Sequence, residues 1–158
     1  MSIYTFSDQT ATLESGLTPD FASLSNIVQH RQAGHYTGST NISAGMKKAR
    51  LELQDNARIN AFKLMILMTD GVANLPGSAA NAKNQVIAEA NLCAAAKIKV
   101  VCIGLGAGAD NALLNQVSSI TGGVTFSVPG GQSVQQVEAQ LKDVFRKIID
   151  SRPLKLVQ

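Results

Sequence analysis

Oxygen-bearing side chains gather in short polar segments that follow or precede apolar runs. Residues 38–41 offer the hydroxyl and amide oxygens of Ser39, Thr40 and Asn41, and the carboxylate of Asp70 comes directly after a run of apolar residues. Hydroxyl and carboxylate oxygens are the donors that Mg²⁺ and Mn²⁺ prefer. Apart from His35, no histidine or cysteine lies near these segments in the sequence, so zinc is not expected. Simpler structural roles also exist, because Asp70 can cap a turn with Gly71, and Thr40 or Asn41 can cap the helix that follows.

The elements that position these donors follow from the apolar pattern. Residues 64–69 form an apolar run too short for a typical helix, which predicts a strand buried on both faces. Similar strands are predicted at 100–103 and 124–128, with helical patterns between them. Strands that alternate with helices indicate an α/β fold, a mainly parallel sheet with helices on both faces. The carboxyl ends of such strands share one edge, where 38–41, 69–71 and the glycine-rich 104–110 should meet.

The remaining elements are predicted from turn and capping signals. Residues 2–6 and 11–17 read as an antiparallel hairpin at the sheet edge, because hairpin-length polar residues separate them. A helix is expected to begin at Thr18-Pro19 and to stop near Gly34. Further helices are expected from Ile42, before Lys97, after Asp110 as its cap, and after a capping box formed by Ser133 and Gln136, with a tail at 151–158.

Composition favours one globular domain over residues 1–158 and excludes several classes of protein. Apolar residues make up 45% of the chain, and charged residues 16%. The net charge of +3 is spread along the sequence without a basic patch, so a nucleic-acid partner is not expected. Two cysteines, Cys93 and Cys102, do not make a disulfide framework and are predicted to be free thiols. No apolar run is long enough to be a membrane segment.

Five short motifs in order resemble the von Willebrand factor A (vWA) domain: residues 3–8, 38–42, 65–71, 100–106 and 113–123. The resemblance implies a Rossmann-like fold and a non-enzymatic module for protein–protein interaction or cell adhesion. It also implies a metal-ion-dependent adhesion site (MIDAS) in which Thr40 and Asp70 are metal ligands, with Ser39, Asn41 and Gly71 in the ligand loops. In that family Mg²⁺ or Mn²⁺ binds an acidic group of a protein partner.

One departure from the family pattern changes these expectations. The family's first strand carries Asp-x-Ser-x-Ser and is central in the sheet, and this sequence contains no such motif. Metal binding is therefore expected to be weak or absent. The strands at 3–6 and 64–69 would also face a gap with unpaired backbone groups, which are costly when buried. Three explanations stay open: the natural protein is longer, the two strands pair directly, or a partner chain fills the gap, for example in a strand-swapped homodimer.

Two further interpretations remain. The helix at 91–97 and the ending at 145–157 resemble the vWA region of Tad-type (Flp) pilus-assembly proteins. That resemblance implies an assembly role completed by a partner strand and a place outside the cytoplasm or at the cell surface; otherwise a cytoplasmic protein is expected. Residues 104–109 also match the dinucleotide-binding fingerprint, with alanine in place of its last glycine, which would indicate a nucleotide-binding enzyme.

Overall fold

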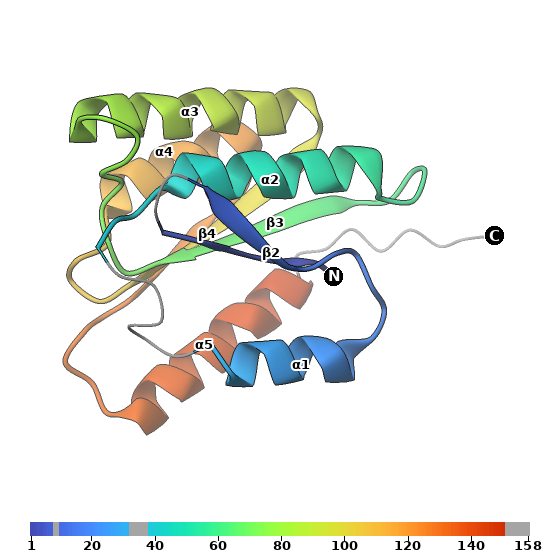
Figure 1. The fold of residues 1–158 in the computed structure, drawn as a ribbon. Coiled ribbons are helices and arrows are strands. Elements are labelled where there is room, and N and C mark those ends of the chain that lie inside the picture. The colour runs from blue at the N-terminus through green and yellow to red at the C-terminus, as the bar shows by residue number, and fades with distance from the viewer. Residues whose placement is uncertain (8–9, 32–37, 151–158) are drawn as a thin grey trace.

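A computed structural model describes residues 1–7, 10–31 and 38–150 (Figure 1). Strands and helices alternate through most of the chain, as the apolar pattern predicts. In chain order the elements are β1 (Ile3–Phe6), β2 (Ala11–Ser15), α1 (Phe21–Gln29), α2 (Ile42–Asp55), β3 (Lys63–Thr69), α3 (Ala79–Ala95), β4 (Ile98–Leu105), α4 (Asn111–Thr121), β5 (Thr125–Val128) and α5 (Val134–Asp150).

The main sheet is parallel, with the strand order β3-β4-β5. Met65 is in register with Val100, and Cys102 with Thr125. Helices α2, α3 and α4 cover one face of this sheet, and α5 packs on the other face (Figure 1). The predicted α/β architecture, with a parallel sheet between helices and an antiparallel hairpin, is confirmed.

The hairpin of β1 and β2 forms a sheet of its own. Its strands are antiparallel, with Tyr4 opposite Leu13 and Phe6 opposite Ala11. Among the described residues no strand pairing joins β1 to β3, so direct pairing across the gap is wrong as an explanation for this chain. Helix α2 packs on β1, β2 and β3, and so it connects the two sheets.

The larger core lies between the main sheet and the three helices above it. Its members include Met46 of α2, Met65 of β3, Val86 of α3 and Leu114 of α4, all of them buried. The Phe6 ring also packs here, so close to α2 that a Cβ added at Gly45 would lie 2.7 Å from the Phe6 Cδ1. The glycine lets β1 approach the helix, and this contact fixes the hairpin to α2.

Strand β3 is buried less completely than its sequence suggests. Met65 and Leu67 belong to the larger core and Thr69 is buried, but 38% of the Ile66 surface, on the opposite face, is exposed to solvent. The prediction of burial on both faces is therefore wrong for this part of β3. The physical reason is that β3 has a hydrogen-bonded neighbour, β4, on one side only.

Helix α1 begins later than predicted. The expected cap, Thr18, instead accepts a hydrogen bond from the Asp20 amide at 3.1 Å, which makes a turn before the helix. Asp20 is the actual N-cap, because its carboxylate accepts the Ser23 amide at 3.1 Å and the Ser23 hydroxyl at 2.6 Å. The predicted stop at Gly34 and the tail at 151–158 lie outside the described residues.

Other local signals are confirmed. Asp110 caps α4, and its side chain accepts the Leu113 amide at 3.1 Å. The Ser133 amide donates to Gln136 Oε1 at 2.9 Å, and the Gln136 amide donates back to Ser133 Oγ at 3.3 Å, so the capping box before α5 is formed.

Candidate functional site

A hollow of about 500 Å³ opens where β1 and β3 end. Its wall combines the end of β1, the loop before α2 and the end of β3, so residues far apart in the sequence meet at one edge. The lining residues are Tyr4, Thr5, Phe6, Ser7, Gly38, Ser39, Thr40, Met68, Thr69 and Asp70. The structure therefore brings Thr40 and Asp70 together, with Ser39 beside them, as the sequence predicts.

Backbone hydrogen bonds hold the Thr40 loop in place. The Thr40 amide donates to Asn74 Oδ1 at 2.7 Å, and the Asn74 amide donates to the Thr40 carbonyl at 3.1 Å. The next amide, that of Asn41, donates to the Ser7 carbonyl at 2.9 Å. These bonds tie the loop before α2 both to the end of β1 and to the loop after β3, which leaves the Thr40 side chain at the hollow.

Close backbone approaches position Asp70. A Cβ added at Gly108 would lie 2.6 Å from the Asp70 carbonyl oxygen, so the loop after β4 packs directly against Asp70. A Cβ at Gly71 would lie 3.2 Å from Thr40 Oγ1. The Gly71 amide donates to Thr69 Oγ1 at 3.3 Å, which makes a tight turn at the end of β3. The three predicted loops thus converge, and two glycines permit the contact.

Asn41 has a structural role. Its Oδ1 accepts the Ala44 amide at 3.1 Å and the Ser43 hydroxyl at 2.9 Å, and its side chain is buried. It is the N-cap of α2, as the simpler interpretation of the sequence allowed. Of the loop residues at 38–41, Ser39 and Thr40 line the hollow, and Asn41 does not.

Asp110 is engaged away from the hollow. The Lys83 ammonium lies 2.7 Å from its Oδ2, and the Leu113 amide donates to its Oδ1. The hydrogen bond from Lys83, followed by that from the Leu113 backbone, lowers the pKa of Asp110. This carboxylate serves as a helix cap and an ion-pair partner, and it supplies no ligand to the hollow. The contribution of residues 104–110 to the site is the packing of Gly108 against Asp70.

The donors at the hollow suit a hard cation in type but are few. Within residues 1–7, 10–31 and 38–150, neither the Asp70 carboxylate nor the Thr40 hydroxyl takes part in a hydrogen bond or an ion pair. The same part of the chain holds no group of three or more histidine, cysteine, aspartate or glutamate side chains that could hold a metal. One carboxylate and neighbouring hydroxyls fit a weakly held Mg²⁺ or Mn²⁺ completed by waters, and do not fit a tightly held ion. His35 lies outside the described residues.

Sequence reasoning missed three residues that shape the site. Ser7 lines the hollow, Asn74 holds Thr40, and Gly108 supports Asp70. Asn74 carries the clearest signal, since an asparagine side chain accepts and donates, and it sits in a polar loop after Asp70-Gly71. No local signal marks which backbone group a glycine such as Gly108 will approach, because that contact is set by the tertiary fold.

Comparison with protein families identifies the fold. The family model described as von Willebrand factor type A domain matches residues 1–140. No curated protein matches the chain in sequence. In the part of the chain that the structure describes, no helix combines the length and the apolar character needed to cross a membrane.

Several solved structures share this fold. The VWA domain of SpRpn10 superposes with a TM-score of 0.69 and 13% identity, over 90% of this chain and 70% of that one. An aerotolerance-related membrane protein from Bacteroides fragilis superposes with a TM-score of 0.69 and 16% sequence identity, over 94% of this chain and 78% of that one. Proximal thread matrix protein 1 from the mussel byssus superposes with a TM-score of 0.69 and 26% sequence identity, over 92% of this chain but only 34% of that one. A further structure of the mussel protein has zinc in its MIDAS motif, with a TM-score of 0.66 and 24% identity, over 90% of this chain and 34% of that one.

Proposed function

Because the chain belongs to the von Willebrand factor type A domain family, we propose that it is a non-enzymatic module that binds another protein at the hollow between β1 and β3. One observation supports this site above others. The Thr40 hydroxyl and the Asp70 carboxylate line the same hollow and have no protein partner among the described residues. Polar groups that converge on a hollow without satisfying one another are typical of binding sites.

The chemistry of the hollow favours binding over catalysis. Its lining residues include two titratable side chains, Tyr4 and Asp70. Tyr4 donates to Glu52 Oε2 at 3.4 Å, and burial together with the nearby Glu52 carboxylate raises the pKa of Tyr4. Tyr4 therefore stays neutral near pH 7, and the described part of the lining places no other titratable side chain beside Asp70.

A metal would act as a bridge to the partner. Thr40 and Asp70 would hold Mg²⁺ or Mn²⁺, and the cation would supply an open coordination position for an acidic group of the partner. Because the described lining residues supply one carboxylate, that of Asp70, this binding would be weak. The partner would therefore contribute much of the stability of the complex, and the metal would bind more tightly with the partner than without it.

Paramagnetic broadening with Mn²⁺ tests the location of the site, since it detects weak binding. In the full chain we expect amide signals of residues 38–41 and 69–71 to broaden first. A hexaglutamate peptide, used as an acidic probe, should bind in the presence of Mg²⁺ and not in the presence of a chelator. Asp70→Asn should remove both effects.

Asp143→Asn is the matched control, because Asp143 is an exposed carboxylate on α5 that pairs with Lys147 and lies outside the hollow. It should leave the broadening at 38–41 and 69–71 unchanged. Equal broadening in the Asp70→Asn protein, or acidic-peptide binding that does not depend on Asp70, would overturn the proposed site.

A further inference from the structure

An apolar side chain stands at the tip of the loop between α2 and β3. The Ala61 amide donates to the Arg58 carbonyl at 3.0 Å, and Asn60 has a left-handed φ of 63°, so these residues form a tight turn. The loop extends past the end of α2 (Figure 1), and the turn leaves 93% of Ile59 exposed. Because turn positions are usually polar, the packing of the fold does not account for this isoleucine.

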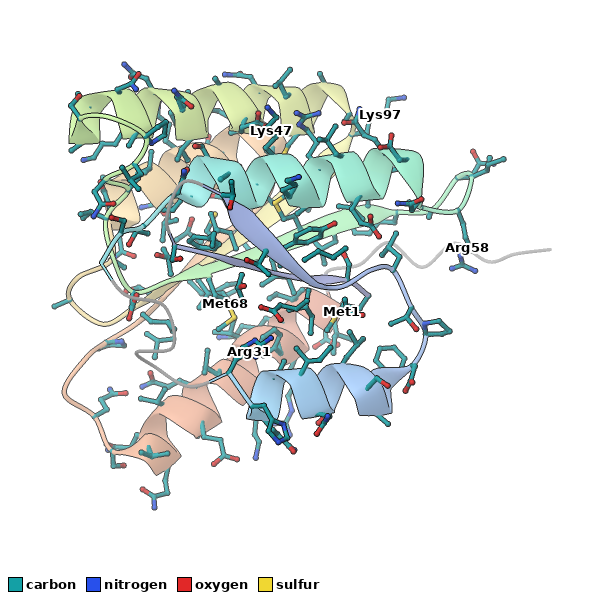
Figure 2. The ribbon with its side chains drawn as sticks, viewed as in Figure 1. Met1, Arg31, Lys47, Arg58, Met68 and Lys97 are labelled. Atoms are coloured by element: carbon teal, nitrogen blue, oxygen red, sulfur yellow. The ribbon has the colours of Figure 1, made fainter. Side chains whose placement is uncertain are left out.

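A second apolar side chain and four cations surround the turn. Phe62 is 45% exposed, and the Lys99 ammonium lies 6.0 Å from the centroid of its ring. Lys63 begins β3, and Lys97 and Lys99 lie at the start of β4, the strand that pairs with β3. Figure 2 shows Arg58 and Lys97 at the same end of the molecule. We call this surface the amino-end patch, because it lies where β3 and β4 begin; its residues are Arg58, Ile59, Phe62, Lys63, Lys97 and Lys99.

The cations of the amino-end patch are not neutralised by ion pairs. Within residues 1–7, 10–31 and 38–150, none of the four takes part in a salt bridge. The acidic residue nearest to Arg58 in the chain is Asp55, which ends α2 and pairs with none of them. The sequence did not indicate this patch, because its cations are spread from residue 58 to residue 99. The fold brings them together around an apolar tip.

An apolar tip among cations suits the surface of an anionic bilayer. The bilayer takes up an apolar side chain without a preformed pocket, and its anionic headgroups attract the cations. Lysine side chains can keep their methylene stems on apolar groups while the ammonium reaches the headgroups. A nucleic acid would bind the cations but would gain nothing from Ile59. An acidic protein would need a pocket shaped to receive the protruding turn.

We propose that the amino-end patch binds reversibly to a lipid bilayer that carries anionic headgroups. Ile59 and Phe62 enter the boundary between headgroups and acyl chains, and the four cations lie among the headgroups. The hollow at Thr40 and Asp70 lies at the other end of β3, roughly 20 Å away. A bound module therefore presents the hollow away from the lipid, and lipid binding does not depend on the protein-binding function proposed above.

Tryptophan fluorescence tests the insertion, because the chain contains no tryptophan of its own. In the full chain with Ile59→Trp, vesicles of phosphatidylcholine and phosphatidylserine should shift the emission to the blue, and brominated lipid should quench it. Vesicles of phosphatidylcholine alone should do neither. Val134→Trp is the matched control, since Val134 is 80% exposed at the start of α5, outside the patch. The same response from both variants, or from neither, would overturn the insertion.

Co-sedimentation with the mixed vesicles measures the contribution of each kind of side chain. Ile59→Ser should weaken binding about tenfold, and Lys97→Gln about fivefold. Lys47→Gln removes an equal charge from an exposed position on α2 outside the patch, and should change binding less than about twofold. Equal losses for Lys97→Gln and Lys47→Gln would show attraction by net charge alone and would overturn the patch.

Two other partners are distinguished by the same variants. Hexaglutamate peptide that binds in the presence of a chelator and is lost in Lys97→Gln, without vesicle binding, would assign the patch to an acidic protein. Duplex DNA that behaves in this way would assign it to a nucleic acid. Either result would overturn the lipid partner.

Asp70→Asn separates lipid binding from the proposed metal function. This variant should bind the mixed vesicles as the wild type does. Vesicle binding by a protein that shows no Mn²⁺ broadening at 38–41 and 69–71 would support the patch and overturn the metal site. Loss of vesicle binding in Asp70→Asn would place the lipid at the hollow and overturn the patch.

Discussion

Among the described residues that line the hollow, Asp70 is the single carboxylate, and this sets how tightly a cation can be held there. Affinity for hard divalent cations rises with the number of charged ligands and the rigidity of the site. The Thr40 backbone is held by two hydrogen bonds to Asn74, so the site is ordered but has little charge.

For the wild-type chain we therefore expect a dissociation constant for Mg²⁺ of about 1 mM or weaker, measured by calorimetry. Asp70→Ala should remove the remaining heat of binding, while Asp143→Ala on α5 should not change it. A micromolar affinity that is lost in Asp70→Ala would contradict this expectation and would require further ligands.

Gly108 tests whether close packing holds the Asp70 loop. Gly108→Ala places a Cβ where the Asp70 carbonyl oxygen lies 2.6 Å away, so the free energy of unfolding should fall by about 1–3 kcal/mol. Urea denaturation measures the change. In the matched variant Gly16→Ala the new Cβ meets Glu52 Oε1 at an ordinary 3.5 Å, so its stability should stay within about 0.5 kcal/mol of wild type. Equal effects of the two substitutions would show that this contact does not constrain the loop.

At the scale of elements, the start of α4 makes a contribution to the stability of the protein that depends on pH. Lys83 and the Leu113 amide stabilise the ionised Asp110, so its pKa in the folded protein lies below the ordinary value of 3.8. A lowered folded pKa gives stability that is present above the ordinary pKa and is lost as the pH falls through the folded pKa.

Asp110→Ala should lower the free energy of unfolding by about 1–2 kcal/mol near neutral pH, because the α4 cap is lost. The difference from wild type should shrink as the pH is lowered below 3.8, where the wild-type carboxyl becomes protonated. Chemical denaturation of both proteins at several pH values measures this. A difference that grows on acidification would show that the ionised form of Asp110 is not the stabilising one.

Helix starts marked by one clear capping signal could be predicted from the sequence. A start at which two residues compete to be the cap could not. The Asp110 cap and the Ser133–Gln136 box were predicted because each needs only residues three positions apart. The start of α1 was predicted wrongly, because Thr18 and Asp20 are both good caps and Asp20 also binds the Ser23 hydroxyl. Such a choice depends on geometry that spacing does not contain.

At the scale of the whole molecule, the core keeps its two thiols inaccessible. Cys93 and Cys102 are free and fully buried. Burial raises the pKa of Cys93 to about 11 and that of Cys102 to about 12, so little of either is thiolate near neutral pH. Thiol reagents react with thiolates.

We expect both cysteines to react with a thiol reagent at a rate that follows global unfolding, and to react at once in denaturant. Mass spectrometry after timed labelling counts the modified thiols. Rapid modification of one cysteine in the folded protein would show that the core opens locally around α3 or β4.

The convergence of Thr40 and Asp70 could be predicted because the carboxyl ends of parallel strands share an edge. The relation of β1 to β3 could not, since an apolar strand pattern does not say which strands pair. The sequence left direct pairing open, and the structure places the two strands in different sheets. Contacts such as Asn74 to Thr40 join residues 34 positions apart and leave no periodic trace.

The separation of the two sheets has a further consequence for cooperativity. The hairpin reaches the rest of the molecule mainly through α2, and Phe6 meets α2 at Gly45. Units attached through few contacts can open without global unfolding. The free energy of opening, measured by hydrogen exchange, should therefore be smaller for the hairpin amides than for the β4 amides. Gly45→Ala should lower the opening free energy of the hairpin further and leave that of β4 unchanged.

The same opening free energy for the amides of β1 and β4 would contradict this expectation. Gly16→Ala serves as the control. If the hairpin opens on its own, the binding hollow lies at the boundary between two cooperative units. The width of the hollow is then governed by a local opening equilibrium, and any ligand that bridges β1 and β3 would raise the stability of the hairpin in proportion to its affinity.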